Sequence, residues 1–570
     1  MASGVVLILL LAVGCGAAAP ATSQPTAVPR PAATTTTSAA ATPAATPALV
    51  PTVAAAPKVN PGKVIWMIGG WGGRMNLLHA SNCHNYDEIL HGYLIASRAA
   101  DRDLIPGIAS KWEVSADGKT WTVTIREGVK YHDAKALTAA DLYFTWLQSW
   151  GPGSEKVATS TSAQAQAKNT QKIEQTGPNQ VSITTKIVDA GFPGFISDAT
   201  GSCQGMVLPR WDLDKLFDEK LIQEYDKNPV ATGVMKLVRH VPEEVMAFER
   251  FDDYYYQPKN GLPEDRRVSF KSLDLRKVPE EATRSAALRA GEADIAPLSL
   301  ATKSQVEAGG GRMVFGKEGT YIRVMLRGAW VPQYPFSKKE VRQALAYALD
   351  LKVFRDKLWG PEIFEPKGWA HMTPSVLGYS PDLDPFPYDP VKARQLLAAA
   401  GYPGGKGFGK LVINTWVSRA VPFLPESAQL AADYWKRDLG IDTEVKVGDE
   451  TELKRATRTE ELHGQILWRE NESRSDPGSI FRSYYGTPVD PARGHDDPRL
   501  YKLTEEAMAV IDPSKRPKAL NDLSRVLREE EYEIGVGYVN IPWGVGPRIK
   551  EWTPFPLAFY PSNLHGIILK

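Results

Sequence analysis

The stretch from residue 104 to residue 146 carries three local signals in a fixed order, and together they constrain the fold strongly. An Asp-Gly pair at 117–118 can adopt positive φ at little cost and so favours a tight turn. In the segment 121–125 apolar and polar residues then alternate, which is the period of a half-buried strand. Thr138 stands ahead of a run of bulky residues as a candidate helix N-cap. The stretch therefore predicts a hairpin followed directly by a helix.

This segment resembles the one that marks family 5 solute-binding proteins, the dipeptide- and oligopeptide-binding receptors of bacterial ABC importers. The family's segment reads roughly "LA-x-W-x-x-x-x-DG-x-x-[YW]-x-[FV]-x-[LI]R-x-GV-[KR]-[FY]-x-DG…T-A-x-D". Trp112, the Asp-Gly turn and Trp121 stand here in the same order. Ala134 occupies a place where the family usually has glycine, so this turn must either avoid positive φ or bear strain.

Other segments resemble the family in the same order along the chain. Residues 231–255 follow its "GTGPY" region, although Val-Met replaces the usual Pro-Tyr at 234–235. Residues 280–295 predict a helix that ends at a Gly-Glu-x-Asp motif, and residues 341–402 contain VRQALAYALD and YDPVKARQLLAAAGY. The resemblance therefore covers nearly the whole chain from residue 63 to residue 570.

The resemblance implies an α/β fold of the bilobal, type II-like periplasmic-binding-protein kind, in its large peptide-receptor form. Lobe one would comprise residues 59–277, with an inserted subdomain at about 82–208, and the C-terminal return at 546–570. Lobe two would comprise residues 278–545. Two crossing segments would join the lobes, and the solute would be enclosed between them.

The segment assigned to lobe two shows alternating strand and helix signals, as an α/β lobe requires. Ser337 and Glu340 have the spacing of a capping box ahead of a helix. A helix at 425–439 would end at Gly440, a natural C′ residue. Strand patterns occur at residues 411–415, 443–447, 466–468 and 534–538.

The N-terminal segment is predicted to be a targeting signal. Residues 5–13 form an apolar run that is too short to span a bilayer, and small residues follow it up to Cys15. This resembles the lipobox of bacterial lipoproteins, in which Cys15 would become the lipid-bearing N-terminus after cleavage of residues ahead of it. An ordinary secretory signal with a chance cysteine is the alternative. Residues 16–58 are almost entirely Ala, Pro, Thr and Ser, so we expect a disordered, proline-stiffened spacer.

About 510 residues follow the spacer, which suits two or three hydrophobic cores. A hydrophobic content of 43% and a charged content of 23% are those of a globular protein. The net charge of +1 gives no electrostatic case for nucleic acid. Cys83 and Cys203 are an even pair, and in an oxidising compartment they are most simply one disulfide.

Two loops after predicted strands of lobe two are the best candidates for ligand contact. A basic residue near Arg419 can pair with the ligand carboxylate in peptide-binding relatives; a solvent-facing arginine is the alternative. By its match to the family's "W-x-x-D-x-x-DP-x-x-[FY]" loop, Asp476 would hold the ligand's ammonium group, although an aspartate before proline also simply forms turns. Trp416 and Trp468 would form a stacking wall, with core packing as the alternative.

Six further candidate contacts are polar or aromatic residues near these loops or in a glycine-rich segment of lobe one: Glu470, Asn471, Tyr484, Tyr485, Trp71 and Arg74. No helix with phosphate-loop spacing follows the glycine-rich residues 69–73, so we do not predict a phosphate cradle there.

These features predict a lipid-anchored extracytoplasmic receptor that captures a solute, most simply a peptide, by hinge closure and passes it to an ABC permease. We expect a monomer without catalytic residues, metal or cofactor. An oligosaccharide or a chelated metal is the alternative ligand within this class. A binding protein without a transporter and, more remotely, a secreted hydrolase are the alternatives from other classes; no HExxH or GxSxG motif supports the latter.

Overall fold

The structure is a computed structural model. It describes residues 62–71, 86–98, 103–154, 161–200, 203–210, 213–418, 421–457, 459–486, 495–558 and 562–570. No helix among these residues has both the length and the apolar content needed to cross a membrane.

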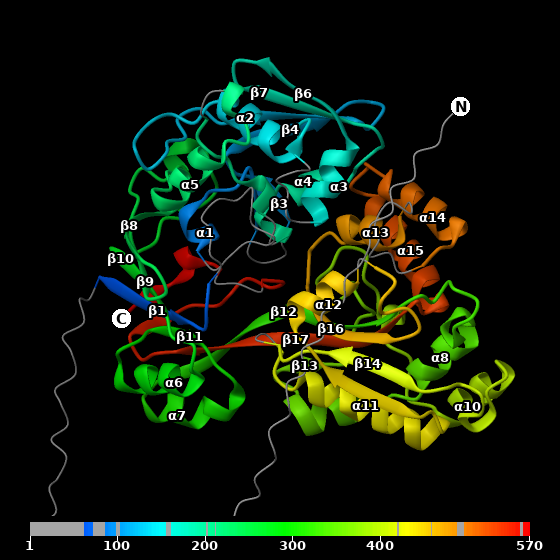
Figure 1. The fold of residues 1–570 in the computed structure, drawn as a ribbon. Coiled ribbons are helices and arrows are strands. Elements are labelled where there is room, and N and C mark those ends of the chain that lie inside the picture. Colours follow the sequence, from blue (N-terminus) through cyan, green and yellow to red (C-terminus); the bar gives the residue numbers. More distant parts are fainter. Residues whose placement is uncertain are drawn as a thin grey trace, which may run out of the picture. The chain divides into compact units, whose positions relative to one another are not determined.

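One mixed sheet of 11 strands runs through this part of the chain (Figure 1). The sheet contains both parallel and antiparallel pairs, and β13 (Phe364–Glu365) pairs with β17 outside the main order. The main order is β15 (Thr443–Val447), β14 (Leu411–Thr415), β16 (Ile466–Glu472), β12 (Arg312–Leu326), β17 (Glu533–Val545), β11 (Ile295–Pro297), β1 (Lys63–Ile68), β10 (Ser272–Lys277), β9 (Val245–Arg250) and β8 (Met235–Val241).

The long strands β12 and β17 belong to both halves of this sheet. The pairing between them shifts register between Gly316 and Thr320 and again between Ile322 and Arg323, which divides their ladder into stretches. At the first shift Glu318 has a φ of 54° and its N–H donates to the Asn540 side chain over 2.9 Å. One stretch pairs toward β11 and β1, and the rest toward β16 and β14. β12 and β17 are thus the two strands through which the halves are joined.

The half around β1 is covered by α6 (Glu281–Ala290) and α7 (Lys303–Ala308). Leu288 and Val306 from these helices pack in one cluster with Ile65 and Met67 of β1. β11 pairs in parallel with β1 through Trp66 and Ile295. This segment therefore packs with β1, while the lobe boundary at residue 278 stays a prediction.

A separate four-stranded sheet holds the predicted hairpin. Its order is β4 (Ala109–Val114), β5 (Thr120–Ile125), β7 (Gln180–Thr185) and β6 (Thr170–Gly177). Its core is built with α2 (Ala139–Trp150), α3 (Thr161–Asn169) and α4 (Phe192–Phe195).

The predicted hairpin and helix are confirmed in detail. Gly118 has a φ of 72° in the turn, and the Asp141 carboxylate accepts the Thr138 N–H over 2.8 Å in a capping box at the start of α2. Ala134 has a φ of 70°, so this turn bears strain and does not avoid positive φ.

The other half of the large sheet is covered by α8 (Lys339–Tyr347), α10 (Pro390–Ala399) and α11 (Leu424–Leu439). α11 ends at Gly440, as expected, with a φ of 70°. The expected capping box at Ser337 does not form. Pro335 starts a 3-10 turn that includes Ser337, whose hydroxyl donates to the Tyr334 carbonyl over 2.9 Å, and α8 begins two residues later with Lys338 at its N-cap position.

A helical layer of α13 (Gly478–Tyr485), α14 (Pro498–Met508) and α15 (Arg516–Glu530) packs around Phe481, Leu500 and Leu520. The remaining elements are α1 (Asp87–Leu90), β2 (Ile95–Ser97), β3 (Leu104–Pro106), α5 (Glu219–Lys227), α9 (Leu351–Phe354) with a π-turn at Arg355–Trp359, α12 (Glu450–Ala456), β18 (Ile549–Glu551) and β19 (Ile568–Leu569).

Candidate functional site

The carboxyl ends of three parallel strands meet at one edge of the large sheet. β14 pairs in parallel with β15, with Thr415 opposite Val447, and in parallel with β16. The loops after β14 and β16 therefore leave the sheet at the same edge. Trp416 and Asp476 lie in these loops, whereas Trp468, Glu470 and Asn471 lie within β16 itself. Open α/β sheets bind their ligands outside the carboxyl ends of the strands.

Three side-chain oxygens at this edge are buried without a hydrogen-bond partner in the described part of the chain. They belong to Thr415 (Oγ1), Glu470 (Oε2) and Asn471 (Oδ1). Thr415 ends β14, and the other two residues lie near the end of β16. Because buried polar atoms are nearly always paired, such a group calls for an explanation, and a ligand or an ordered water supplies one. The candidates Glu470 and Asn471 thus meet a physical requirement of a binding site.

The expected stacking wall of Trp416 and Trp468 is contradicted by the packing. Trp468 is fully buried, donates to the Ser427 hydroxyl over 2.8 Å and packs against Phe354. Trp416 is 1% exposed and donates to Glu470 Oε1 over 3.3 Å. Both rings are core residues, and neither presents a free face.

Asp476 already has a cationic partner within the chain. The Arg516 fork donates to both carboxylate oxygens over 2.7 and 2.9 Å, and the Gly478 N–H donates to one of them over 2.8 Å. The Arg516 side chain is only 6% exposed. The turn-forming alternative is therefore realised, while an ammonium-binding role for Asp476 stays a prediction.

Tyr484 and Tyr485 belong to a buried polar cluster between the sheet and α13. The Arg323 guanidinium of β12 lies 3.7 Å from the centre of the Tyr484 ring and forms a buried ion pair with Glu533 of β17. His371 stacks on Tyr484 at 5.8 Å, and Tyr485 is fully buried. Tyr485 is therefore a core residue, whereas Tyr484 is partly buried and a ligand contact for it stays a prediction.

The same cluster holds charges that were not predicted as functional residues. Burial, followed by the positive charge of Arg323, holds the pKa of His371 well below its usual range. The sequence did carry a signal, because Arg323 interrupts the apolar run of β12 between Ile322 and Val324. A charge in such a run calls for a buried partner, but the sequence does not name Glu533 as that partner.

Of the lobe-one candidates, Trp71 is half-buried and meets His240 edge-on at 6.5 Å. Cys203 is disulfide-bonded. The pairing with Cys83 stays a prediction, because Cys83, together with Cys15, Arg74 and Arg419, lies outside the described residues.

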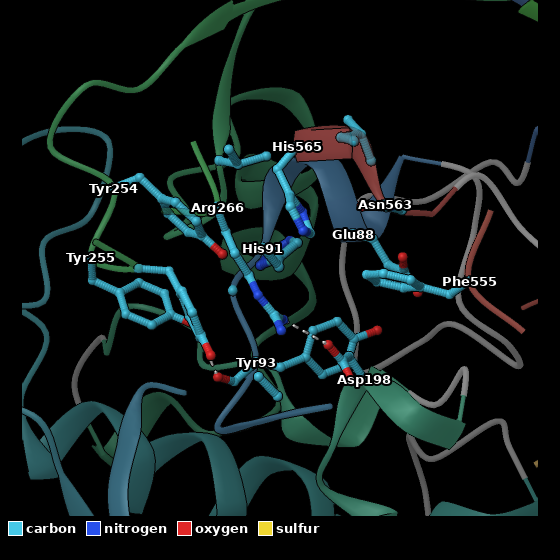
Figure 2. Close-up of a pocket in the computed structure, with 15 residues that line it drawn as sticks. Glu88, His91, Tyr93, Asp198, Tyr254, Tyr255, Arg266, Phe555, Asn563 and His565 are labelled. Carbon is cyan, nitrogen blue, oxygen red and sulfur yellow. Dashed lines mark hydrogen bonds and ion pairs between the residues drawn. The ribbon is translucent and has the colours of Figure 1, made fainter. Parts of the chain in front are cut away.

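A cavity of about 70 Å³ lies away from this edge, between α1, the residues after β9 and the C-terminal segment (Figure 2). The Arg266 guanidinium points toward Asp198, and Glu88, His91 and His565 line the space around it. Both nitrogens of the buried His91 ring lack a hydrogen-bond partner among the described residues. This volume has room for about five water molecules and is several-fold below the ~300 Å³ at which ligand pockets begin.

Burial makes the two cavity histidines poor bases. It lowers the pKa of His91 to about 3 and the pKa of His565 to about 4. Arg266 is held by the Ser97 carbonyl at 3.0 Å and by Glu264 at 2.6 Å. The cavity therefore presents neutral imidazoles beside a firmly held cation, which suits water better than a charged solute.

Comparison with known proteins identifies relatives of this chain. It is 24% identical to the dipeptide-binding protein of Escherichia coli over 498 residues, which cover 82% of this chain and 87% of that protein. It is 23% identical to heme-binding protein A of Haemophilus influenzae over 522 residues, or 86% and 89% of the two chains.

Among solved structures, the periplasmic binding protein DppA of Helicobacter pylori in complex with the peptide STSA has a TM-score of 0.70 at 18% identity, and the match covers 89% of this chain and 98% of that one. Residues 103–491 match the family described as bacterial extracellular solute-binding proteins, family 5. The chain belongs to this family.

Proposed function

We propose that this protein is an extracytoplasmic receptor that captures a peptide between two lobes and delivers it to an ABC permease. The observation that carries the proposal is that Thr415 Oγ1, Glu470 Oε2 and Asn471 Oδ1, buried toward the carboxyl ends of β14 and β16, have no hydrogen-bond partner among the described residues. Peptide N–H groups are donors that would satisfy them. The Escherichia coli relative is named for dipeptide binding, and the Helicobacter pylori structure holds a peptide.

Closure of the lobes is part of the proposal, and contacts between distant segments support it. Arg482 of α13 donates to the Val188 carbonyl over 2.7 Å and lies 3.2 Å from Asp189, in the segment after β7. The Ala190 N–H donates to the Met508 carbonyl of α14 over 3.2 Å. These contacts tie the four-stranded subdomain to the helical layer over the other half of the large sheet. A ligand that touches both sides would favour this closed form.

Anchoring through a lipid on Cys15, with residues 16–58 as a spacer, completes the proposal. It rests on the sequence pattern around Cys15. Metabolic labelling with an alkyne-modified fatty acid would test it, because a Cys15→Ser variant should lose the label and be released from the membrane.

The central test is a thermal-shift screen of the mature chain with di- to hexapeptides, oligosaccharides and heme. A ligand at a hundredfold excess over its Kd stabilises the folded state by about 2.7 kcal/mol, so a bound peptide should raise the Tm clearly. Tryptophan fluorescence should change with the same midpoint concentration. A Tm that responds to a sugar or to heme and to no peptide would reject the peptide assignment.

A further inference from the structure

Three exposed apolar residues belong to segments that begin or end at this carboxyl edge. Val417 is 75% exposed, Val447 is 56% exposed and Phe423 is 50% exposed. Val447 ends β15 opposite Thr415, Val417 follows β14 by two residues, and Phe423 precedes α11, the helix that leaves this edge. We call these three residues the apolar edge. Val417 is the most exposed large apolar side chain in the described part of the chain.

Phe423 is held in a backbone conformation that works against folding. It has φ 61° and ψ 23°, in the left-handed region that costs a bulky residue about 1–2 kcal/mol. The Trp359 indole fixes the preceding Pro422 carbonyl over 2.5 Å, and the Ser427 N–H donates to the Phe423 carbonyl over 2.9 Å. Glycine or asparagine would fit this position with less strain.

The exposed Phe423 ring gains little packing energy to offset that strain. Its neighbours Val421 and Leu424 are fully buried, while half of the Phe423 side chain faces solvent. A strained, exposed aromatic residue beside unpartnered polar atoms is typical of a binding surface rather than of a core. The polar atoms of Thr415 and Glu470 at the same edge would bind the backbone of a ligand, and the apolar edge would contact a ligand side chain.

We propose that the apolar edge binds a large apolar side chain of the captured ligand, so that the receptor prefers peptides that carry a Leu, Phe or similar residue. This inference rests on the proposed peptide-receptor function and deepens it. Phe423 and Val447 would act as specificity-determining residues, because burying their faces against an apolar group removes both from water.

The decisive variant is Phe423→Gly, because it should stabilise the ligand-free protein and at the same time weaken ligand binding. Relief of the left-handed strain should raise the Tm of the ligand-free protein. Loss of the aromatic face should weaken binding of a leucine-rich tripeptide about tenfold, as the loss of apolar pocket contacts does. Binding of triglycine, which has no apolar side chain, should change less than twofold.

A second variant tests whether the effect of Phe423→Gly comes only from a changed loop conformation. Val447→Ser alters a strand end with no positive φ and should weaken the leucine-rich peptide about threefold. Val391→Ser is the matched control, because Val391 is also 56% exposed but lies on α10. It should leave every affinity unchanged.

Calorimetry on the wild type and the three variants separates the outcomes. Equal affinity losses for the leucine-rich peptide and triglycine, or no loss for either, would overturn the apolar-edge assignment while leaving the peptide receptor intact. Unchanged affinities combined with loss of peptide uptake in cells would assign the edge to the permease and also overturn it. A wild type that binds sugars and no peptide would reject the proposed function itself, and this inference with it.

Discussion

At the residue scale, Ala134 is a site where one methyl group destabilises the fold. Its φ of 70° and its exposed position mean that it bears strain without gaining packing. Ala134→Gly should therefore stabilise the protein by about 0.5–1 kcal/mol, because relief of the strain exceeds the added freedom of the unfolded chain. Urea denaturation measures the change. Ala136→Gly, at an exposed neighbour without positive φ, should destabilise instead; a gain for both variants would contradict the strain argument.

The buried histidines make stability depend on pH. Burial lowers the pKa of His91 to about 3, whereas in the unfolded chain it is about 6.5, so below pH 6.5 the unfolded state binds the extra proton. This histidine should therefore lower the free energy of unfolding by about 2 kcal/mol on going from pH 7 to pH 5.

His91→Gln should flatten the slope of stability against pH between 6.5 and 4, as measured by urea denaturation at each pH. His132 and His565, whose pKa values burial lowers to about 4, and His371, whose pKa burial holds well below its usual range, contribute to the slope that remains. A variant with the wild-type slope would show that His91 is protonated in the folded state.

The candidate site shows which residue roles a sequence reveals. Glu470 and Asn471 were expected just after a strand and lie within its last residues, where Glu470 Oε2 and Asn471 Oδ1 have no partner among the described residues. The roles of Trp468 and Asp476 depended on Ser427 and Arg516, which are 41 and 40 residues away. No local pattern identifies such partners, so the sequence left packing and binding as alternatives.

At the element scale, structure that is decided locally was predictable. The strands expected at 411–415 and 443–447 have these bounds in β14 and β15, because alternation and flanking turn residues decide both ends. The strands expected at 466–468 and 534–538 are longer, as β16 and β17, because their extra residues are held by pairing with β12. Pairing partners more than a hundred residues away leave no trace in a local pattern.

The failed capping box at Ser337 makes the same point for a helix end. Its spacing to Glu340 is right, but the preceding Pro335 already commits the chain to a 3-10 turn. Ser337 then donates to Tyr334, and α8 starts at Lys339 without its help. A proline just upstream should weigh against a capping-box prediction, since the 3-10 turn that it starts takes in Ser337 and moves the N-cap position to Lys338.

At the scale of the whole molecule, the join between the halves depends on long-range pairing. The sequence resemblance put the change of lobe near residue 278, where the chain pattern changes. The structure keeps α6, β11 and α7 packed with β1 and runs both β12 and β17 through the large sheet. The contacts that oppose opening lie elsewhere, between the segment after β7 and α13.

Arg482 is the residue through which closure can be tested. Its side chain is 17% exposed and contacts Val188 and Asp189. Glu505, which lies in the same helical layer as Arg482, is 3.7 Å away. Arg482→Gln removes the charged contact, which is worth about 1.5 kcal/mol, and so should weaken ligand binding about tenfold by favouring the open form. Small-angle scattering of the ligand-free protein should show a larger radius of gyration.

Three comparisons distinguish loss of the closing contact from a general loss of charge. Arg499→Gln removes an arginine of α14 that pairs with Asp497 and Glu530, both of which belong to the same helical layer, and it should change neither affinity nor radius. In a double-mutant cycle, Asp189→Asn and Arg482→Gln should be non-additive, because each removes the same pair. Raising the ionic strength should weaken ligand binding in the wild type more than in Arg482→Gln, since salt screens the pair that the variant lacks. Additive losses with equal salt dependence would place closure under the control of other contacts, and the register shift of β12 at Glu318 would then be the next position to vary.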